Sequence, residues 1–210
     1  MTDFYHEGSR QLQDRFETRP LANRLAESIV SRQISPEDQA FIEAQNMFFL
    51  ATVDNNGHPS CSYKGGSVGL VKVIDEQTLA FPLYDGNGMY LSAGNVLLNS
   101  EVSLLFVDFQ RQARLRVNGT AFIQEHDPML ADWPGAQMIL RVKLRDLFPN
   151  CPRYIHKMTL VEESVFVPKL DCETPAPAWK SLEVVADVLP PRDSHLAGHG
   201  QDAAAALNRG

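Results

Sequence analysis

The chain has 210 residues, of which 44% are hydrophobic and 21% charged, and its formal net charge is -7. This length and composition are typical of a soluble globular domain with additions, large enough to bury a core. The negative charge argues against a general surface for nucleic acid or anionic membranes, and no apolar run approaches the roughly 20 residues of a membrane span.

The N-terminal stretch and the cysteines indicate the cellular compartment of the protein and whether it binds a metal. MTDFYHEGSRQLQDRF is charged and lacks the apolar core of a secretion signal. Cys61, Cys151 and Cys172 form an odd, scattered set without CxxC spacing, and the six histidines do not pair with them at ligand spacing. We therefore expect a cytoplasmic protein without a metal site.

The first 46 residues are predicted to form a helical extension. SRQLQDRF is a short amphipathic segment, and PLANRLAESIVSRQ places Leu21, Leu25 and Ile29 on one helix face. Ser35 is a suitable N-cap for a third helix, because proline and two acidic residues follow it in the first turn.

From Met47 the pattern changes to that of strands. Seven segments are rich in β-branched and aromatic residues, and short turns such as DNNGHP and QRQ separate them. One helix, near GMYLSAGNVLLNS, interrupts the series. The links are too short for repeated crossover helices, so we expect a mainly β protein with an antiparallel barrel and peripheral helices. The seven segments are MFFLATV, SCSYKGG, VGLVKVID, TLAFPLY, VSLLFVDF, ARLRVNGTAFIQ and AQMILRVKL.

The chain is thus expected to divide into four parts. A helical extension covers residues 1-46, the barrel covers 47-158, and a proline-punctuated C-terminal extension covers 159-189. Residues 190-210 lack a sustained apolar face and are expected to form a flexible or partner-draped tail.

The segment FPLYDGNGMYLSAGN is a candidate phosphate site. A strand ends at Tyr84, a turn with two glycines follows, and a helix begins near Gly88 or Met89. The unpaired N–H groups of a helix N-terminus attract phosphate, and Asn87 adds a side-chain donor. The alternative is an ordinary strand–turn–helix connection with good turn residues.

Two groups of basic residues are further candidates for binding an anion. Lys64 and Tyr63 lie near a strand end, before two glycines where backbone can approach a ligand; the alternative is an exposed lysine beside a bulge. Arg114 and Arg116 point to the same face of a strand. Either an anion separates these two guanidinium groups or acidic side chains of the same surface do.

A stiff segment, DLFPNCPRYI, follows the last predicted strand. Pro149 and Pro152 restrict the backbone, and this restriction holds the side chains between and after them without regular pairing. Such a segment suits the edge of a polar site or a neighbouring subunit, or it is a stiff surface loop. The side chains concerned are Asn150, Cys151, Arg153 and Tyr154.

Together these motifs resemble the pyridoxamine 5′-phosphate oxidase-like, FMN-binding split-barrel superfamily. The strand order, the DGNG turn before a helix and VSLLFVDF…RLRVNG carry the likeness. CSYKGG, FPLYDGNGMYLSAGN and FPNCPRYIH resemble its branch of predicted flavin-nucleotide-binding proteins. The likeness covers about residues 41–158.

The resemblance implies a homodimer of six-stranded antiparallel split barrels with two FMN sites at the interface. Lys64, Asn87 and the backbone of Gly88 and Met89 would hold the phosphate, with Arg114 or Arg116 assisting. Along the ribityl chain and isoalloxazine would lie Ser62, Tyr63, Tyr84 and Asp85. From the opposite subunit would come Asn150, Cys151, Arg153 and Tyr154.

The chain also departs from the oxidase itself. Where that enzyme has Ser-Arg-Lys after its turn glycine, this chain has Asn87-Gly88-Met89-Tyr90, and Ser62 stands in place of an arginine. Vitamin B6 oxidation is therefore not carried over. The resemblance favours an FMN-dependent oxidoreductase using reduced nicotinamide or a small substrate, with unassigned catalytic residues. The alternatives are a flavin carrier or sensor, or a barrel that binds haem or a deazaflavin.

Overall fold

The computed structural model describes residues 4–124 and 126–198, and the chain forms two compact units, 1–162 and 163–210. The first unit contains the barrel and the candidate site.

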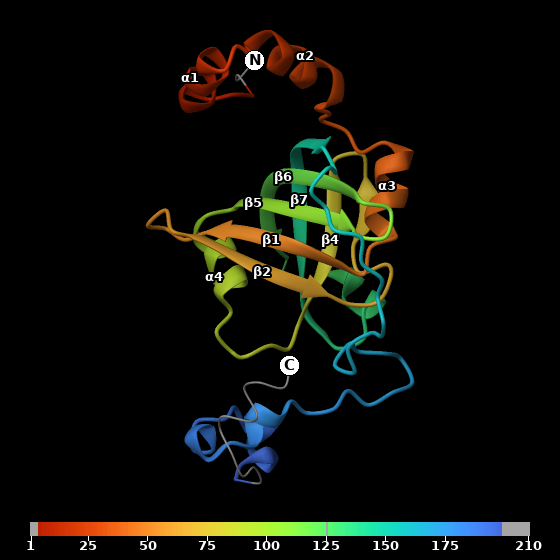
Figure 1. The fold of residues 1–210 in the computed structure, drawn as a ribbon. Coiled ribbons are helices and arrows are strands. Elements are labelled where there is room, and N and C mark those ends of the chain that lie inside the picture. Colours follow the sequence, from red (N-terminus) through yellow and green to blue (C-terminus); the bar gives the residue numbers. More distant parts are fainter. Residues whose placement is uncertain (1–3, 125, 199–210) are drawn as a thin grey trace. The chain divides into compact units, whose positions relative to one another are not determined.

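A single antiparallel sheet of seven strands forms the first unit, in the order β2-β1-β5-β6-β7-β4-β3 (Figure 1). The end strands β2 and β3 have no pairing with each other among the described residues, so the barrel is open between them. The strands are β1 (Met47–Val53), β2 (Pro59–Gly65), β3 (Lys72–Asp75), β4 (Thr78–Tyr84), β5 (Glu101–Asp108), β6 (Ala113–Ile123) and β7 (Ala136–Pro149).

Two features differ from the sequence expectations. The sheet has seven strands and not the six that the resemblance implies, because the short β3 pairs with β4 as an additional edge strand. The last strand also continues through Asp146 to Pro149, where the sequence suggested an exit after Leu144. Burial explains this extension, since Leu147 faces the core and is 1% exposed.

Aromatic side chains fill the interior of the barrel. Phe48, Phe81 and Phe106 are fully buried, and the Phe48 ring centroid lies 4.8 Å from that of Phe81 and 5.3 Å from that of Phe106. These three residues come from β1, β4 and β5. Packing of such large rings at a common centre joins strands that are distant in the sequence.

Three helices precede the sheet: α1 (Glu7–Arg15), α2 (Arg19–Ile29) and α3 (Pro36–Glu43). The predicted cap of α3 is present, because Ser35 Oγ accepts from the Asp38 N–H and Asp38 accepts from the Ser35 N–H. The apolar face of α2, by contrast, is not buried: Leu21, Leu25 and Ile29 are all exposed.

The second unit contains three 3₁₀ helices, Ala178–Ser181, Glu183–Val185 and Pro191–Leu196. A buried ion pair joins the first of them to the third, with 2.9 Å between Lys180 Nζ and Asp193 Oδ2. Within the predicted tail of residues 190-210, Pro191–Leu196 form the third of these helices, and the part from 199 onward lies outside the described residues. In the described ranges, every helix is too short or too polar to cross a bilayer.

Candidate functional site

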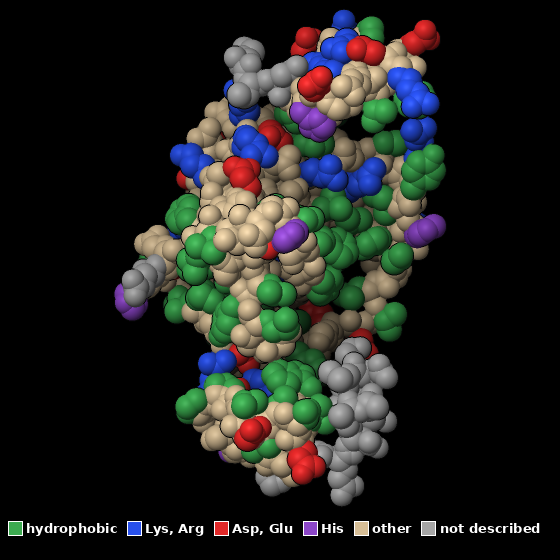
Figure 2. Space-filling view, turned by 90° about the vertical axis from the view of Figure 1, so that its left-hand side faces the viewer, with side chains coloured by type: hydrophobic (Ala, Val, Ile, Leu, Met, Phe, Trp, Pro, Cys, Tyr) green, Lys and Arg blue, Asp and Glu red, His purple; other side chains and the backbone are tan. Residues whose placement is uncertain are grey.

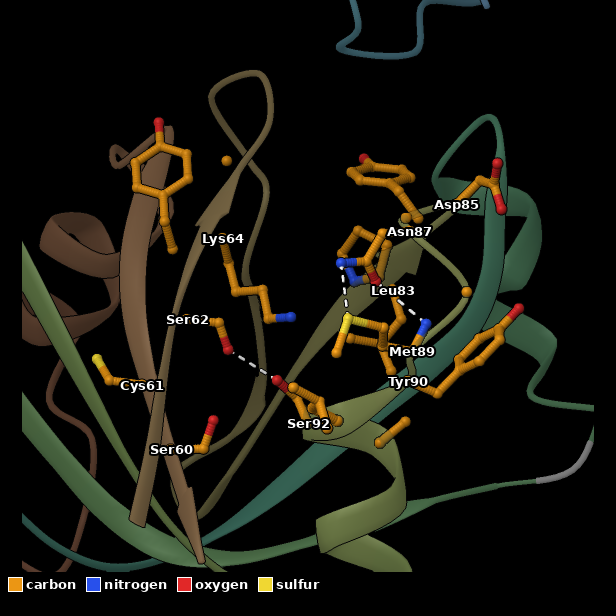
Figure 3. Close-up of a pocket in the computed structure, with 18 of the residues that line it drawn as sticks. Ser60, Cys61, Ser62, Lys64, Leu83, Asp85, Asn87, Met89, Tyr90 and Ser92 are labelled. Carbon is orange, nitrogen blue, oxygen red and sulfur yellow. Dashed lines mark hydrogen bonds between the residues drawn. The ribbon is translucent and has the colours of Figure 1, made fainter. Parts of the chain in front are cut away.

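A cleft of about 400 Å³ opens between the edge strand β2 and the connection from β4 to α4 (Leu91–Leu98). Its walls are the inner face of β2, the end of β4, the loop from Asp85 to Tyr90, and the first turn of α4 (Figure 3). The cleft thus lies on the split side of the barrel, where β2 lacks a second neighbour. Its volume is within the range of small-molecule sites.

The alternation of β2 decides which of its side chains face the cleft. Lys64 lies opposite Phe48 and Ser62 lies opposite Leu50, and both β1 partners are buried in the core. Figure 3 shows Ser60, Ser62 and Lys64 on this side of the strand. Successive side chains point to opposite faces of a sheet, so these three residues form one polar row on the inner face.

Cys61 and Tyr63 point to the other face of β2. Tyr63 is 62% exposed, and its ring centroid lies 6.1 Å from that of Phe49 on β1. Cys61 points away from the cleft in Figure 3. The sequence grouped Tyr63 with Lys64, but the strand separates the Tyr63 ring from the Lys64 ammonium.

Lys64 carries an uncompensated charge. Its side chain is half-buried, and among the described residues it makes no hydrogen bond or ion pair. Burial lowers the pKa of this ammonium from its usual value of 10.5 because desolvation disfavours the charged form. An anion bound in the cleft would raise the pKa of Lys64 again, because it stabilises the charged form.

The loop that follows β4 faces Lys64 across the cleft. Gly88 has φ +78°, a left-handed conformation that favours glycine. The Met89 N–H donates to Asn87 Oδ1 over 3.1 Å, and Asn87 Nδ2 contacts Met89 Sδ at 3.2 Å. The turn is therefore held by its own side chains, with Asn87 and Met89 on the wall of the cleft.

The N-terminus of α4 forms the end of the same cleft. Its N-cap residue, Tyr90, makes no side-chain cap bond, and Gly94 is the first residue whose N–H bonds back to Tyr90. Ser62 Oγ and Ser92 Oγ are 2.7 Å apart, which joins β2 to the first turn of the helix. The positive end of the α4 dipole thus lies at the polar row of β2.

The remaining wall is largely apolar and comes from Leu70, Pro82, Leu83 and Tyr84. Burial raises the pKa of the Tyr84 phenol. Asp85 borders the cleft, but its carboxylate accepts a hydrogen bond from Gln137 Nε2 over 3.0 Å. The cleft therefore combines a cationic and polar lining from β2 and the start of α4 with apolar side chains from Leu70, Pro82 and Leu83.

The two arginines of β6 lie on the outer face of the sheet. Arg114 and Arg116 alternate with the buried Leu115 and Val117, so they share one face as predicted, but that face is not the one that carries Lys64. Arg116 borders a second groove of about 370 Å³, where its guanidinium carbon lies 5.9 Å from the Phe148 ring centroid. Neither arginine assists Lys64 within one chain.

The predicted NCPRY segment also lies outside the cleft of its own chain. Arg114 Nη2 donates to the Cys151 carbonyl over 2.6 Å, and Arg153 Nε lies 3.1 Å from Cys151 Sγ. The backbone N–H and the guanidinium of Arg153 lower the pKa of the exposed Cys151 thiol. Tyr154 is 86% exposed, and Asn150 Oδ1 is buried without a partner in the described structure.

The structure therefore divides the predicted site residues into two groups. Those that share the cleft are Ser62, Lys64, Tyr84, Asn87, Gly88 and Met89, with Tyr63 and Asp85 at its border and their polar groups turned elsewhere. Those on the outer face or beyond β7 are Arg114, Arg116, Asn150, Cys151, Arg153 and Tyr154.

Sequence reasoning missed three residues of the site. Ser60 was signalled by its alternation with Ser62 and Lys64, and Ser92 by its place in the first turn of the predicted helix. Gln137 had no local signal, because it lies about fifty residues beyond the loop that it contacts.

Comparison with known proteins gives one family match. The model of the family described as pyridoxamine 5′-phosphate oxidase matches residues 34–148. A search of curated protein sequences finds no match to this chain.

Several solved structures resemble part of the chain. A Lactobacillus delbrueckii protein named as a candidate pyridoxamine 5′-phosphate oxidase is 23% identical, over 56% of this chain and 95% of that one, with a TM-score of 0.45. HutZ, the haem storage protein of Vibrio cholerae, is 20% identical over 55% and 94%, with a TM-score of 0.42. An FMN-binding protein of Syntrophomonas wolfei is 13% identical over 68% and 96%, with a TM-score of 0.40. At these scores the pairwise likenesses carry no weight about ligand or activity.

Proposed function

Because the chain belongs to the pyridoxamine 5′-phosphate oxidase family over residues 34–148, we propose that it binds FMN in the cleft between β2 and α4. The observation that carries this proposal is the half-buried Lys64, which has no anionic partner in the part of the chain that the structure describes and faces a glycine-rich turn and an uncapped helix N-terminus.

The cationic and polar lining of the cleft suits the phosphate of FMN. A phosphate there would accept a charge-assisted hydrogen bond from Lys64 and further bonds from Ser62, Asn87 and the first N–H groups of α4. The partial positive charge of the helix terminus adds to that of the ammonium. These contributions act together because Ser62 and Ser92 hold β2 and α4 against each other.

The apolar side chains of the cleft suit the ring of the same molecule. Leu70, Pro82, Leu83 and Tyr84 offer a largely nonpolar wall with one phenol, as expected of a site that buries an aromatic ligand and orients it with few polar groups. When bound, FMN supplies the electron-transfer chemistry, and the chain binds the cofactor, orients it and limits access of water. Oxidation of pyridoxamine phosphate is not part of the proposal, since Asn87–Tyr90 replace the Ser-Arg-Lys run.

The absorption spectrum of the purified protein, and of stripped protein refilled with FMN or haemin, tests the proposal. We expect flavin bands and a stoichiometric flavin site, with loss of retained flavin in Lys64→Ala and Asn87→Ala. A Soret band with tight haemin binding, or full flavin retention in both variants, would contradict the assignment.

Turnover is a separate part of the proposal. We propose that the bound flavin accepts electrons from a reduced nicotinamide or a small substrate, which would make the protein an oxidoreductase. Anaerobic mixing with NADH or NADPH should bleach the flavin, and air should restore its colour. An inert, tightly held flavin would instead indicate a carrier or sensor.

We also propose that two copies of the barrel associate. The outer face carries a groove in which Phe49, Leu105 and Phe148 lie beside polar side chains such as Arg116. The helix α4 exposes Leu97 and Leu98 at 72% and 73%. Figure 2 looks onto the side of the barrel that bears α4 and shows hydrophobic side chains among the polar ones. Pairing would cover such surface and bring the NCPRY segment to a second copy. A monomeric mass in solution would contradict this.

A further inference from the structure

A single side chain on β7 contacts both ends of the loop that borders the cleft. Gln137 Nε2 donates to Asp85 Oδ1 over 3.0 Å, and the Tyr90 hydroxyl donates to Gln137 Oε1 over 3.0 Å. Asp85 is the first residue after β4, and Tyr90 is the last before α4. Figure 3 shows the side chains of both pointing away from Lys64. One amide group therefore fixes the distance between the two ends of the loop.

The backbone of β7 is adapted to this contact. Leu83 pairs with Met138 and Tyr84 pairs with Ala136, so Gln137 is the extra residue of a bulge. A bulge bends the strand and redirects the side chain of the inserted residue, and bulges are frequent next to binding sites. The half-buried Gln137 side chain is thereby directed at the loop and not into the regular alternation of the strand.

The loop needs such a restraint. It contains Gly86 and Gly88, and every residue from Asp85 to Leu91 is exposed. Tyr90 adopts φ +48°, a conformation that is disfavoured for residues with a Cβ atom. Because Tyr90 is also the N-cap of α4, the bond from its hydroxyl to Gln137 helps to hold the helix terminus in its present direction.

We propose that Gln137 is a positioning residue of the anion site: it holds the Asp85–Tyr90 loop and the start of α4 in the arrangement that receives a phosphate group. This inference rests on the proposed FMN site and adds to it a residue that does not touch the ligand. Without the amide, the loop would have to be ordered at the moment of binding, and affinity for phosphate-bearing ligands would fall.

The ratio of the dissociation constants of riboflavin and FMN tests this role, because the two ligands differ only in the phosphate. In Gln137→Met, which keeps the length of the side chain and removes both bonds, FMN should bind about tenfold more weakly. Riboflavin affinity and the melting temperature of the ligand-free protein should not change, the latter within about 2 °C. Tyr90→Phe breaks one of the two bonds and should show a smaller loss of the same kind.

Gln33→Met is the matched control. Gln33 Nε2 makes an exposed, long-range bond of 2.9 Å to Glu76, away from the cleft, and its loss should leave both affinities unchanged. Suppose that wild-type protein prefers FMN, and that Gln137→Met either keeps this preference or loses affinity for both ligands equally. The proposed role of Gln137 is then wrong, but the proposed FMN site is not contradicted. If wild-type protein has no preference for FMN, the proposed site fails and this inference fails with it.

Discussion

Two cations of the same barrel, Arg141 and Lys64, are both shielded from water but differ in what faces them. Arg141 on β7 makes two bonds to Asp127, from Nε over 2.6 Å and from Nη2 over 3.0 Å. The Asp127 side chain is 1% exposed. Lys64 has no such partner among the described residues.

The pKa shifts report the same difference. The bonds from Arg141 lower the pKa of Asp127, and the bond to Asp127 raises that of Arg141, so each group favours the charge of the other. Burial alone acts on Lys64, and it lowers the pKa of that ammonium. A buried charge that is paired with an opposite charge of the same chain is part of the folded structure. A buried charge without such a partner, beside a cleft, can instead bind an oppositely charged ligand.

The largest effect should come from breaking the satisfied pair. In Arg141→Met the carboxylate of Asp127 stays buried without its partner, which should lower the free energy of unfolding by about 3–5 kcal/mol. Urea denaturation measures this loss. Adding Asp127→Asn should recover part of the stability, and a single-variant loss below about 1 kcal/mol would show that the two cations are equivalent.

Removal of the unsatisfied cation should affect binding and not folding. Lys64→Met removes a desolvated charge, so we expect the free energy of unfolding to stay within about 1 kcal/mol of the wild-type value or to rise. FMN affinity should fall about 10- to 100-fold, the contribution of a hydrogen bond to a charged group. Titration of the stripped protein, followed by flavin fluorescence, measures it.

Acid should weaken the Asp127 pair. The pKa of Asp127 is lower in the folded chain than in the unfolded one, so its contribution to stability is fully present above the unfolded pKa near 3.8 and is lost as the pH falls through the folded value. The doubly substituted Arg141→Met/Asp127→Asn protein should lack this part of the acid dependence. Denaturation midpoints below pH 5 compare the two, and equal slopes would contradict the assignment.

Alkali should weaken the Lys64 site. Burial lowers the pKa of Lys64 in the free protein, while a bound phosphate stabilises the ammonium and raises it. FMN binding therefore takes up a proton, and affinity should decline with rising pH before the usual lysine pKa of 10.5 is reached. Lys64→Met should show no such decline.

The smallest effect should come from Arg141→Lys. The ammonium keeps the charge but replaces two directed bonds with one, which should cost about 1 kcal/mol. A loss as large as that of Arg141→Met would mean that geometry and not charge dominates this pair.

Much of the fold could be predicted because its signals are local. Six of the seven strand segments and the Ser35 cap follow from residues within a short window, while VGLVKVID forms a strand only over Lys72–Asp75. The continuation of β7 beyond Leu144 could not be predicted in the same way, because the burial of Leu147 depends on its pairing with Val117 on β6.

The candidate site was predictable only in part for the same reason. Lys64 and Asn87 were found from their neighbours, and the alternation of β2 could have separated Tyr63 from Lys64. Strand alternation correctly predicted that Arg114 and Arg116 share one face of β6. It could not predict that this face is opposite to the one that carries Lys64, because the arrangement of the whole barrel decides which face of β6 lies outward. Gln137 reaches the loop through tertiary pairing and a bulge.

The affinities of FMN and riboflavin for the wild-type and Lys64→Met proteins, measured side by side, test the central claim most directly. Wild-type protein should prefer FMN by at least about tenfold, and in Lys64→Met that preference should fall by about tenfold or more while the protein folds normally. Equal affinities in the wild-type protein, or a preference for FMN that is undiminished in Lys64→Met, would contradict the account.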